Sequence, residues 1–173
     1  MRKYILLFFS LFFFVPYVST AEGYQPNPYQ VKAALLYNFA KFTEWPKAND
    51  AELVFGILGK DPFGETLERL VSGRTVGGKK IVLKRFAKLE ELEPTHLLYV
   101  NLPMKEVPRL ISEIKEQNVL TIGDTKGFLK AGGVINFVNR PGRVKFQINK
   151  SAADKAGVKI SSALVGLADK VVE

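Results

Sequence analysis

Residues 59–66, GKDPFGET, are the stretch of this sequence most similar to a known phosphate-binding motif. They match the pattern G-x-x-x-x-G-K-[ST] except that Glu65 occupies the position of the lysine that would contact the phosphates. A carboxylate at that position would repel a nucleotide. Asp61 and Pro62 favour a different interpretation, because aspartate is a preferred helix N-cap and proline a preferred first helical residue. We therefore predict a helix that begins at Pro62 and ends before Gly73, and no nucleotide site.

Polar residues follow three of the predicted strands, at the ends where an open α/β sheet binds its ligands: Asp61, Asn101 and Asp124. They form a candidate crevice for a small ligand. A phosphoaccepting receiver domain has a similar architecture, but it needs an aspartate after the third strand, where this chain has Asn101. Asp124 and Thr125 also suit a second interpretation, in which they cap the turn that follows their strand. The residues themselves leave both interpretations open.

The residue types needed for common metal and catalytic sites are scarce. The chain has one histidine, His96, and no cysteine, whereas a zinc site of ordinary composition needs several such ligands. A histidine-based triad also needs a placed serine, and the sequence contains no G-x-S-x-G. We predict that the protein is not an enzyme and has no catalytic residue, metal or cofactor.

The N-terminus has the pattern of a secretory signal peptide. Arg2 and Lys3 precede an apolar run over residues 5–18, and the small residues Ser19 and Ala21 mark a cleavage site after Ala21. Removal of these 21 of the 173 residues takes two positive charges from a net charge of +8. The exported chain is then predicted to have 152 residues and a net charge of +6.

The positive charge of the exported chain limits its possible partners. An exported protein rarely meets nucleic acid, so we predict no nucleic-acid partner. Its charge is suited to anionic lipid headgroups, acidic cell-wall polymers or an acidic protein, and it also serves solubility. Composition alone leaves these alternatives open.

Hydrophobic periodicity predicts a single domain over residues 31–173, preceded by a flexible, proline-containing lead-in over residues 22–30. A mostly buried helix runs from Val31 and stops by Trp45, because the residue before Pro46 is disfavoured in a helix. The other predicted elements are apolar strands at 53–58, 81–86, 96–101 and 119–123, a hairpin around 140–143, and helices at 108–118, 151–157 and 161–172. This order predicts a three-layer α/β sandwich with a mostly parallel central sheet and an antiparallel C-terminal hairpin.

Four aromatic residues lie close together in YNFAKFTEWP, residues 37–46. Phe39, Phe42 and Trp45 belong to this group, and aromatic residues at helical spacing usually fill a core. We therefore predict that packing of the helix on the sheet buries most of them. Trp45, at the exit beside Pro46, is the one that we single out as a candidate contact with a partner.

The C-terminal segment VKISSALVGLADKVV predicts a second contact surface. One stripe of its predicted helix should pack on the sheet and consists of Leu164, Leu167, Ala168 and Val171. Val158 and Ile160 precede the helix, alternate around Lys159 and have no place in that stripe. They are candidates for a partner-binding patch. The alternative, that both residues seal the margin of the sheet, stays open.

Several segments, in this order, resemble the YfiR-like proteins of Gram-negative bacteria. The features are an aromatic helix ending in Trp-Pro, then G-x-D-P-F-G, then Gly-Gly before a strand, and F-x-I-N before a helix. In full the segments read KAALLYNFAKFTEWP, GILGKDPFGETLERLVSGRTVGGKKI and VLTIGDTKGFLKAGGVINFVNRPGRVKFQINKSAADKAGVKISSALVGLA. Each alone is unspecific, but the ordered set is specific and covers nearly the whole mature chain.

The resemblance implies a periplasmic regulator that binds the periplasmic part of an inner-membrane diguanylate cyclase and represses it, with effects on cyclic di-GMP and biofilm. It also implies a homodimer, and an outer-membrane lipoprotein that sequesters the repressor. Some of the similar proteins form disulfides, but this chain has no cysteine, so redox control is not implied here. An alternative is a periplasmic small-ligand sensor that signals to a histidine kinase.

Overall fold

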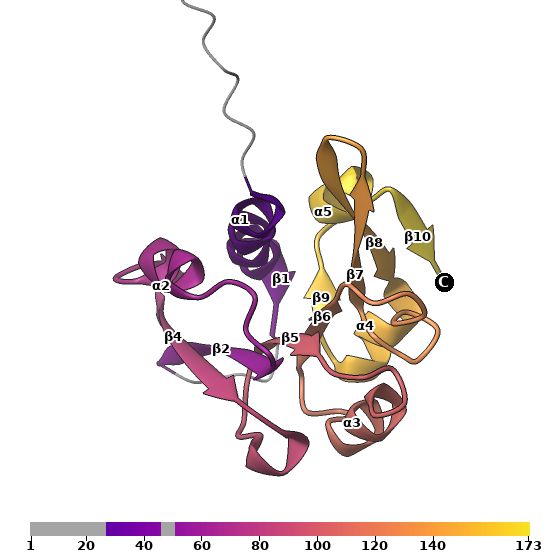
Figure 1. Ribbon diagram of the computed structural model, residues 1–173, viewed down its shortest axis with the longest axis horizontal. Coiled ribbons are helices and arrows are strands. Elements are labelled where there is room, and N and C mark those ends of the chain that lie inside the picture. The colour runs from indigo at the N-terminus through magenta and orange to yellow at the C-terminus, as the bar shows by residue number, and fades with distance from the viewer. Residues whose placement is uncertain (1–26, 46–50) are drawn as a thin grey trace, which may run out of the picture.

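A computed structural model describes residues 27–45 and 51–173. The predicted signal peptide and its cleavage site after Ala21 lie outside the described residues. Within them, no helix has the length and hydrophobicity needed to cross a bilayer. The described chain folds around one large sheet (Figure 1).

The large sheet has eight strands in the order β10-β8-β7-β6-β5-β2-β4-β3 (Figure 1). Its strands are β2 (Glu52–Gly59), β3 (Thr75–Val76), β4 (Lys79–Phe86), β5 (Leu97–Asn101), β6 (Leu120–Gly123), β7 (Ile135–Arg140), β8 (Arg143–Asn149) and β10 (Lys170–Val172). From β4 to β7 the neighbours pair in parallel, whereas β7 and β8 form an antiparallel hairpin. The predicted fold class is confirmed. A separate two-stranded sheet joins β1 (Thr43–Glu44) to β9 (Lys159–Ile160).

Helices cover both faces of the large sheet (Figure 1). They are α1 (Pro28–Lys41), α2 (Glu65–Val71), the 3-10 helix η1 (Leu89–Glu91), α3 (Val107–Glu113), α4 (Lys150–Ala156) and α5 (Ser162–Leu167). Alternate residues of a strand point to opposite faces. Phe55 and Ile57 therefore join the hydrophobic cluster that contains α1 and α2, whereas Leu58 joins the cluster that contains α3. These two clusters separate the three layers of the sandwich.

Helix α1 begins earlier than predicted. Asn27 is its N-cap and forms a capping box with Gln30. Asn27 Oδ1 accepts a hydrogen bond from the Tyr29 backbone N at 2.9 Å, and Gln30 Oε1 accepts one from the Asn27 backbone N at 3.1 Å. Residues 28–30, predicted to belong to the flexible lead-in, therefore form the first turn of the helix. The sequence contains the signal for this helix start. An asparagine lies at the N-cap position, a proline at the first helical position and a glutamine at the third.

Helix α2 begins later than predicted, at Glu65 rather than at Pro62. Asp61 is not a helix N-cap. Its Oδ1 atom instead accepts hydrogen bonds from the backbone N atoms of Phe63 at 2.7 Å and of Gly64 at 3.2 Å. The side chain therefore closes a turn that precedes the helix, which is a second common role of aspartate next to proline.

The C-terminal helix is shorter than predicted. It ends at Leu167, and Lys170–Val172 form β10, which pairs in parallel with β8. Leu164 is buried as expected, but Leu167 is 65% exposed and Val171 lies in a strand, so the predicted helical stripe is wrong. The apolar residues of this segment fit either element, and pairing with β8 decides in favour of the strand.

Gly59 provides a test of the packing at the end of β2. Its φ is 89°, and a Cβ atom there would clash with the carbonyl oxygen of Asn101 on the neighbouring strand β5. We expect Gly59→Ala to lower the free energy of unfolding by about 3 kcal/mol or more, because left-handed strain and a backbone clash add together. Urea denaturation followed by circular dichroism measures this change.

Gly73 is the matched control for that variant. Its φ is 69°, but a Cβ atom there meets nothing within 4 Å. Gly73→Ala should therefore cost only about 1 kcal/mol, from backbone strain alone. Equal costs at Gly59 and Gly73 would contradict the close approach of β2 and β5.

Candidate functional site

The three polar residues predicted to form a ligand crevice lie at one edge of the sheet, at the carboxyl ends of β2, β5 and β6. All three form hydrogen bonds within the protein. Asp61 Oδ2 accepts a hydrogen bond from Arg85 Nε at 2.8 Å, and Asn101 Nδ2 donates one to the Lys60 carbonyl oxygen at 2.7 Å. Asp124 has partners of its own. The crevice therefore stays a prediction, and these internal bonds do not favour it.

Asp124 belongs to a buried polar cluster with Lys32 and Tyr99. Its Oδ2 atom accepts hydrogen bonds from Lys32 Nζ at 3.0 Å and from the Tyr99 hydroxyl at 2.9 Å. The side chains of Lys32 and Asp124 are 1% and 19% exposed, so the ion pair lies almost wholly inside the protein. Lys32 comes from α1, Tyr99 from β5, and Asp124 directly follows β6. The cluster therefore joins α1 to two central strands.

Aromatic rings surround the same lysine. Lys32 Nζ lies 4.7 Å from the centre of the Tyr29 ring and 5.7 Å from that of Phe137. Phe63 packs edge-on against Tyr99, with ring centres 4.7 Å apart. Attraction of the ammonium to the ring faces partly offsets its loss of water. Because the cluster is closed in this way, its geometry favours the fixing of α1 on the sheet over ligand binding.

The Tyr99 hydroxyl is held in its protonated form. Burial raises its pKa well above the usual tyrosine value, and the negative charge of Asp124 raises the pKa further. Tyr99 therefore donates its hydrogen bond to Asp124 at any pH near neutrality. A general acid or base needs a pKa near the operating pH. The cluster therefore has a structural role, and Tyr99 is unsuited to proton transfer near neutral pH.

Lys32 was absent from the residues predicted to be functional. The buried positions of α1 are Lys32, Ala33, Leu36, Phe39 and Ala40. Lys32 lies four residues before Leu36 and seven before Phe39, which is the spacing of one helical face. A lysine on a buried face needs a partner of opposite charge. Its spacing therefore predicts a buried ion pair, but only the fold identifies the partner.

The residues predicted to contact a partner lie around the sheet of β1 and β9. Trp45 Nε1 donates a hydrogen bond to the His96 carbonyl oxygen at 3.1 Å, and its ring packs on the core while remaining partly exposed. Ile160 is likewise half-buried. Val158 is 1% exposed, so it seals the core, as in the alternative interpretation, and is not available to a partner. A contact role for Trp45 and Ile160 stays a prediction.

Two large hydrophobic side chains predicted to pack in the core are exposed instead: Phe42 by 38% and Leu167 by 65%. Phe39 is fully buried, with its ring centre 4.9 Å from that of Phe146. The prediction of core packing is therefore confirmed for Phe39 and wrong for Phe42.

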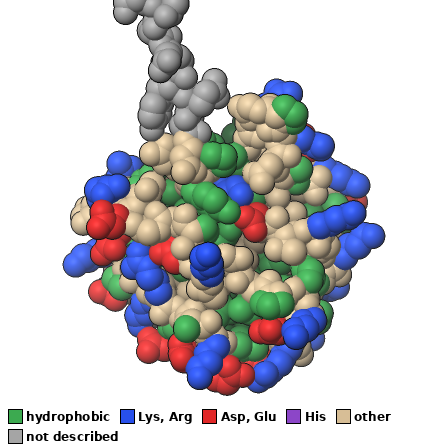
Figure 2. All heavy atoms as spheres, viewed as in Figure 1, with side chains coloured by type: hydrophobic (Ala, Val, Ile, Leu, Met, Phe, Trp, Pro, Cys, Tyr) green, Lys and Arg blue, Asp and Glu red, His purple; other side chains and the backbone are tan. Residues whose placement is uncertain are grey.

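A backbone hydrogen bond joins the end of α1 to the start of α5. The Phe42 carbonyl oxygen accepts a hydrogen bond from the backbone N of Ser161, which is the N-cap of α5. Leu167 is the last residue of this six-residue helix, which is about 9 Å long. Figure 2 shows hydrophobic side chains at the surface between α1 and the C-terminal elements. We refer to Phe42, Ile160 and Leu167 as the α1–α5 surface.

Positive charge is concentrated in the C-terminal part of the chain. Residues 130–173 contain eight Lys and Arg against three Asp and Glu, a net charge of +5. Residues 22–129 contain fifteen against fourteen, a net charge of +1. Figure 2 shows lysine and arginine side chains along the side of the molecule formed by the C-terminal elements. An acidic partner would be attracted to that side.

Residues 29–169 match the YfiR/HmsC-like family, a range that runs from the first turn of α1 to the residues beyond α5. The chain belongs to this family. The YfiR/HmsC-like assignment confirms the resemblance seen in the sequence. No curated protein matches the chain.

Solved structures share the fold at low sequence identity. An ABC domain of Streptococcus pneumoniae, in complex with L-Trp, is 13% identical with a TM-score of 0.56, over 84% of this chain and 61% of that one. A conserved domain protein of Vibrio cholerae O1 biovar El Tor is 14% identical with a TM-score of 0.55, over 83% and 60%. The chain thus spans about three fifths of either. These similarities establish the fold alone.

Membership in the YfiR/HmsC-like family agrees with the resemblance from which a regulatory role is expected. The part of the chain that the structure describes contains no group of three or more His, Cys, Asp or Glu side chains placed to hold a metal ion. The hydrogen bonds of Lys32 and Tyr99 to Asp124 make this cluster a structural junction, which substitutions can test.

We expect Lys32→Met to lower the free energy of unfolding by about 3 kcal/mol, because Asp124 would keep its charge in a mostly buried position without a cation. The double variant with Asp124→Asn should be less destabilised than the sum of the two single variants, since neither charge remains. Urea denaturation of the mature protein measures all three variants.

The exposed pair of Arg69 and Glu65 is the matched control, with side chains 70% and 83% exposed. Arg69→Met should change the free energy of unfolding by no more than about 0.5 kcal/mol. Similar effects of the substitutions at Lys32 and Arg69 would contradict a structural role for the buried pair.

Tyr99 should make the protein less stable at alkaline pH. Since its pKa is raised in the folded state, its contribution to stability is full below the usual tyrosine pKa of about 10 and is lost as the pH rises above that value. We expect Tyr99→Phe to be less stable near neutral pH, because the hydrogen bond to Asp124 is lost, but to decline less steeply above about pH 10. Melting temperatures across this range measure both effects, and parallel declines would count against titration of Tyr99.

Proposed function

We propose that this chain is a periplasmic repressor of an inner-membrane diguanylate cyclase. It binds the periplasmic part of the cyclase stoichiometrically and keeps the enzyme inactive, which lowers cyclic di-GMP and limits biofilm formation. The observation that carries this proposal is the match of residues 29–169 to the YfiR/HmsC-like family. A homodimer, and an outer-membrane lipoprotein that sequesters the repressor, belong to the proposal on the strength of the family resemblance alone.

The α1–α5 surface is the contact surface that we propose for the cyclase. Protein interfaces combine an apolar centre with a polar rim. Phe42 and Leu167 supply exposed apolar area, and the neighbouring residues Lys41, Glu44 and Lys159 are exposed and charged. This combination of an apolar centre and a charged rim supports a protein partner.

Trp45 and Ile160 are proposed as the edge of the same contact. The Trp45 ring is held by its hydrogen bond to His96 and by edge-on packing against the His96 ring at 6.0 Å. Ile160 is held by the pairing of β9 with β1. Side chains that are ordered before binding lose little conformational entropy when a partner covers them.

Repression by binding requires a difference in affinity. A ligand shifts a conformational equilibrium only by its preference for one state over the other. The repressor must therefore contact the inactive conformation of the cyclase more extensively than the active one. The pairing of β1 with β9 and the hydrogen bond from Ser161 to Phe42 hold the proposed contact surface in a fixed shape. A fixed shape can be complementary to one conformation of the cyclase and not to the other, which is what repression by binding requires.

The alternative proposal is a small-ligand sensor that signals to a histidine kinase through a site at Asp61, Asn101 and Asp124. The internal hydrogen bonds of these three side chains weigh against it, because a ligand would have to displace Arg85, Lys60 or Lys32. We therefore favour the repressor.

Deletion of the gene should raise cellular cyclic di-GMP, measured by mass spectrometry of cell extracts, and expression of the unmodified protein should restore the original level. Leu167→Asp should fail to restore it, because a charge would enter the proposed apolar contact. The melting temperature should change little, since Leu167 is 65% exposed.

Lys80→Asp is the control for that experiment. Lys80 is exposed in β4, at the other end of the large sheet, and its variant should repress normally. Normal repression by Leu167→Asp would remove α5 from the interface. Unchanged cyclic di-GMP after deletion, with the protein shown to be exported, would contradict the repressor role itself.

A further inference from the structure

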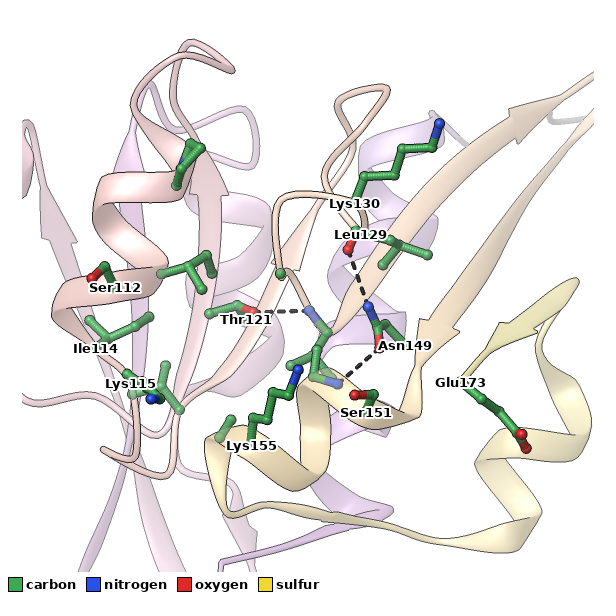
Figure 3. Close-up of a pocket in the computed structure, with 17 residues that line it drawn as sticks. Ser112, Ile114, Lys115, Thr121, Leu129, Lys130, Asn149, Ser151, Lys155 and Glu173 are labelled. Carbon is green, nitrogen blue, oxygen red and sulfur yellow. Dashed lines mark hydrogen bonds between the residues drawn. The ribbon is translucent and has the colours of Figure 1, made fainter.

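A cavity between α3 and α4 has no part in the proposed contact with the cyclase (Figure 3). Its volume is about 430 Å³, within the range of small-molecule sites in proteins. It is lined by α3 and the residues after it, by β6, by the segment before β7, by α4 and by the C-terminal residue Glu173. These elements come from four separate stretches of the sequence, so only the fold assembles the cavity.

The walls of the cavity are aliphatic. Ile114, Val119, Val134 and Ala152 line it, and each is less than 10% exposed to bulk solvent. Ile111, Leu129, Pro108 and Ala156 complete the apolar lining. Among the residues that the structure describes, no aromatic one lines it. The walls are therefore suited to a saturated hydrocarbon and offer no ring on which an aromatic ligand could stack.

Positive charge dominates the polar part of the lining. Lys115, Lys130 and Lys155 line the cavity against one carboxylate, Glu173. Within the described chain, Lys130 and Lys155 form no ion pair, and the nearest carboxylate to Lys115 is Glu116 at 3.9 Å. Figure 3 shows Lys155 projecting from α4 into the cavity, whereas the Lys130 ammonium points outward at the rim. One cation, Lys155, is thus directed at the space that a ligand would occupy.

The remaining polar groups divide into bonded and available ones. The Asn149 amide is used twice, because its Nδ2 donates to the Leu129 carbonyl oxygen at 3.1 Å and its Oδ1 accepts from the Ala152 backbone N at 2.9 Å. Thr121 Oγ1 accepts from the Val134 backbone N at 3.1 Å and keeps its own hydroxyl proton to donate. Donors at Thr121 and Lys155 therefore face the cavity, which favours a ligand that accepts hydrogen bonds.

We infer that this cavity binds a small monocarboxylate with an aliphatic body. The carboxylate pairs with the Lys155 ammonium, and the hydrocarbon packs between Ile114, Val119 and Val134. The Lys155 ammonium matches a single negative charge, and a charge-assisted hydrogen bond to it is about twice as strong as a neutral one. This inference does not depend on the proposed function, because it requires no protein partner.

Octanoate is the probe for this site. Two matched ligands serve as controls: octan-1-ol lacks the negative charge, and acetate lacks the hydrocarbon chain. We expect octanoate to bind the mature protein in isothermal titration calorimetry, and each of the other two to bind about tenfold more weakly or less. In amide NMR spectra, octanoate should shift signals of residues 111–121 and 149–156. Absence of octanoate binding, equal binding of octan-1-ol, or shifts confined to other regions would each overturn the inference.

Two variants then test the assigned residues. Lys155→Glu should weaken octanoate binding by about tenfold or more through loss of the charge-assisted hydrogen bond. Ala156→Leu should weaken it by filling the cavity. Lys80→Glu makes the same charge change on an exposed residue of β4, three strands away from β6, and should leave the affinity unchanged. Unchanged affinity in both Lys155→Glu and Ala156→Leu would place octanoate elsewhere and overturn the inference, whatever the cyclic di-GMP measurements show.

Discussion

The buried ion pair of Lys32 and Asp124 is the interaction on which the arrangement of the N-terminal helix depends. Each charge loses several kcal/mol of hydration when it leaves water, and only close contact and further hydrogen bonds offset that loss. The 3.0 Å contact and the Tyr99 hydroxyl meet this requirement in one position of α1 on the sheet. Apolar packing alone tolerates sliding of a helix, whereas this pair does not. Because α1 leads directly into β1, the same pair also positions Phe42.

Backbone hydrogen bonds carry this constraint to the C-terminus. β1 pairs with β9, the Phe42 carbonyl oxygen accepts from Ser161, and beyond α5 the Asp169 backbone N donates to the Phe146 carbonyl oxygen at 2.8 Å. The segment that carries α5 is therefore held at both ends by main-chain bonds. This arrangement holds the helix that carries the exposed Leu167 in a fixed position.

The two regions of proposed binding share one continuous segment. Helix α4 lines the cavity, ends at Gly157 in a left-handed conformation with φ of 74°, and continues through the buried Val158 into β9. The concentration of positive charge after residue 129 covers the same part of the chain. Both proposals thus place the recognition of anionic or acidic groups in the C-terminal part of the domain.

The sequence by itself determined the fold class, because buried parallel strands appear as continuous apolar runs and the turn at Pro141-Gly142 specifies a hairpin. Its ordered motifs also determined the family. Of the buried cluster it singled out Asp124, and the helical spacing of Lys32 indicates a buried ion pair. That these two residues, 92 apart along the chain, are partners could not be seen. Only the tertiary structure decided that Val158 is buried and Leu167 exposed. Periodicity reports which side of an element is apolar, whereas burial depends on which distant element covers that side.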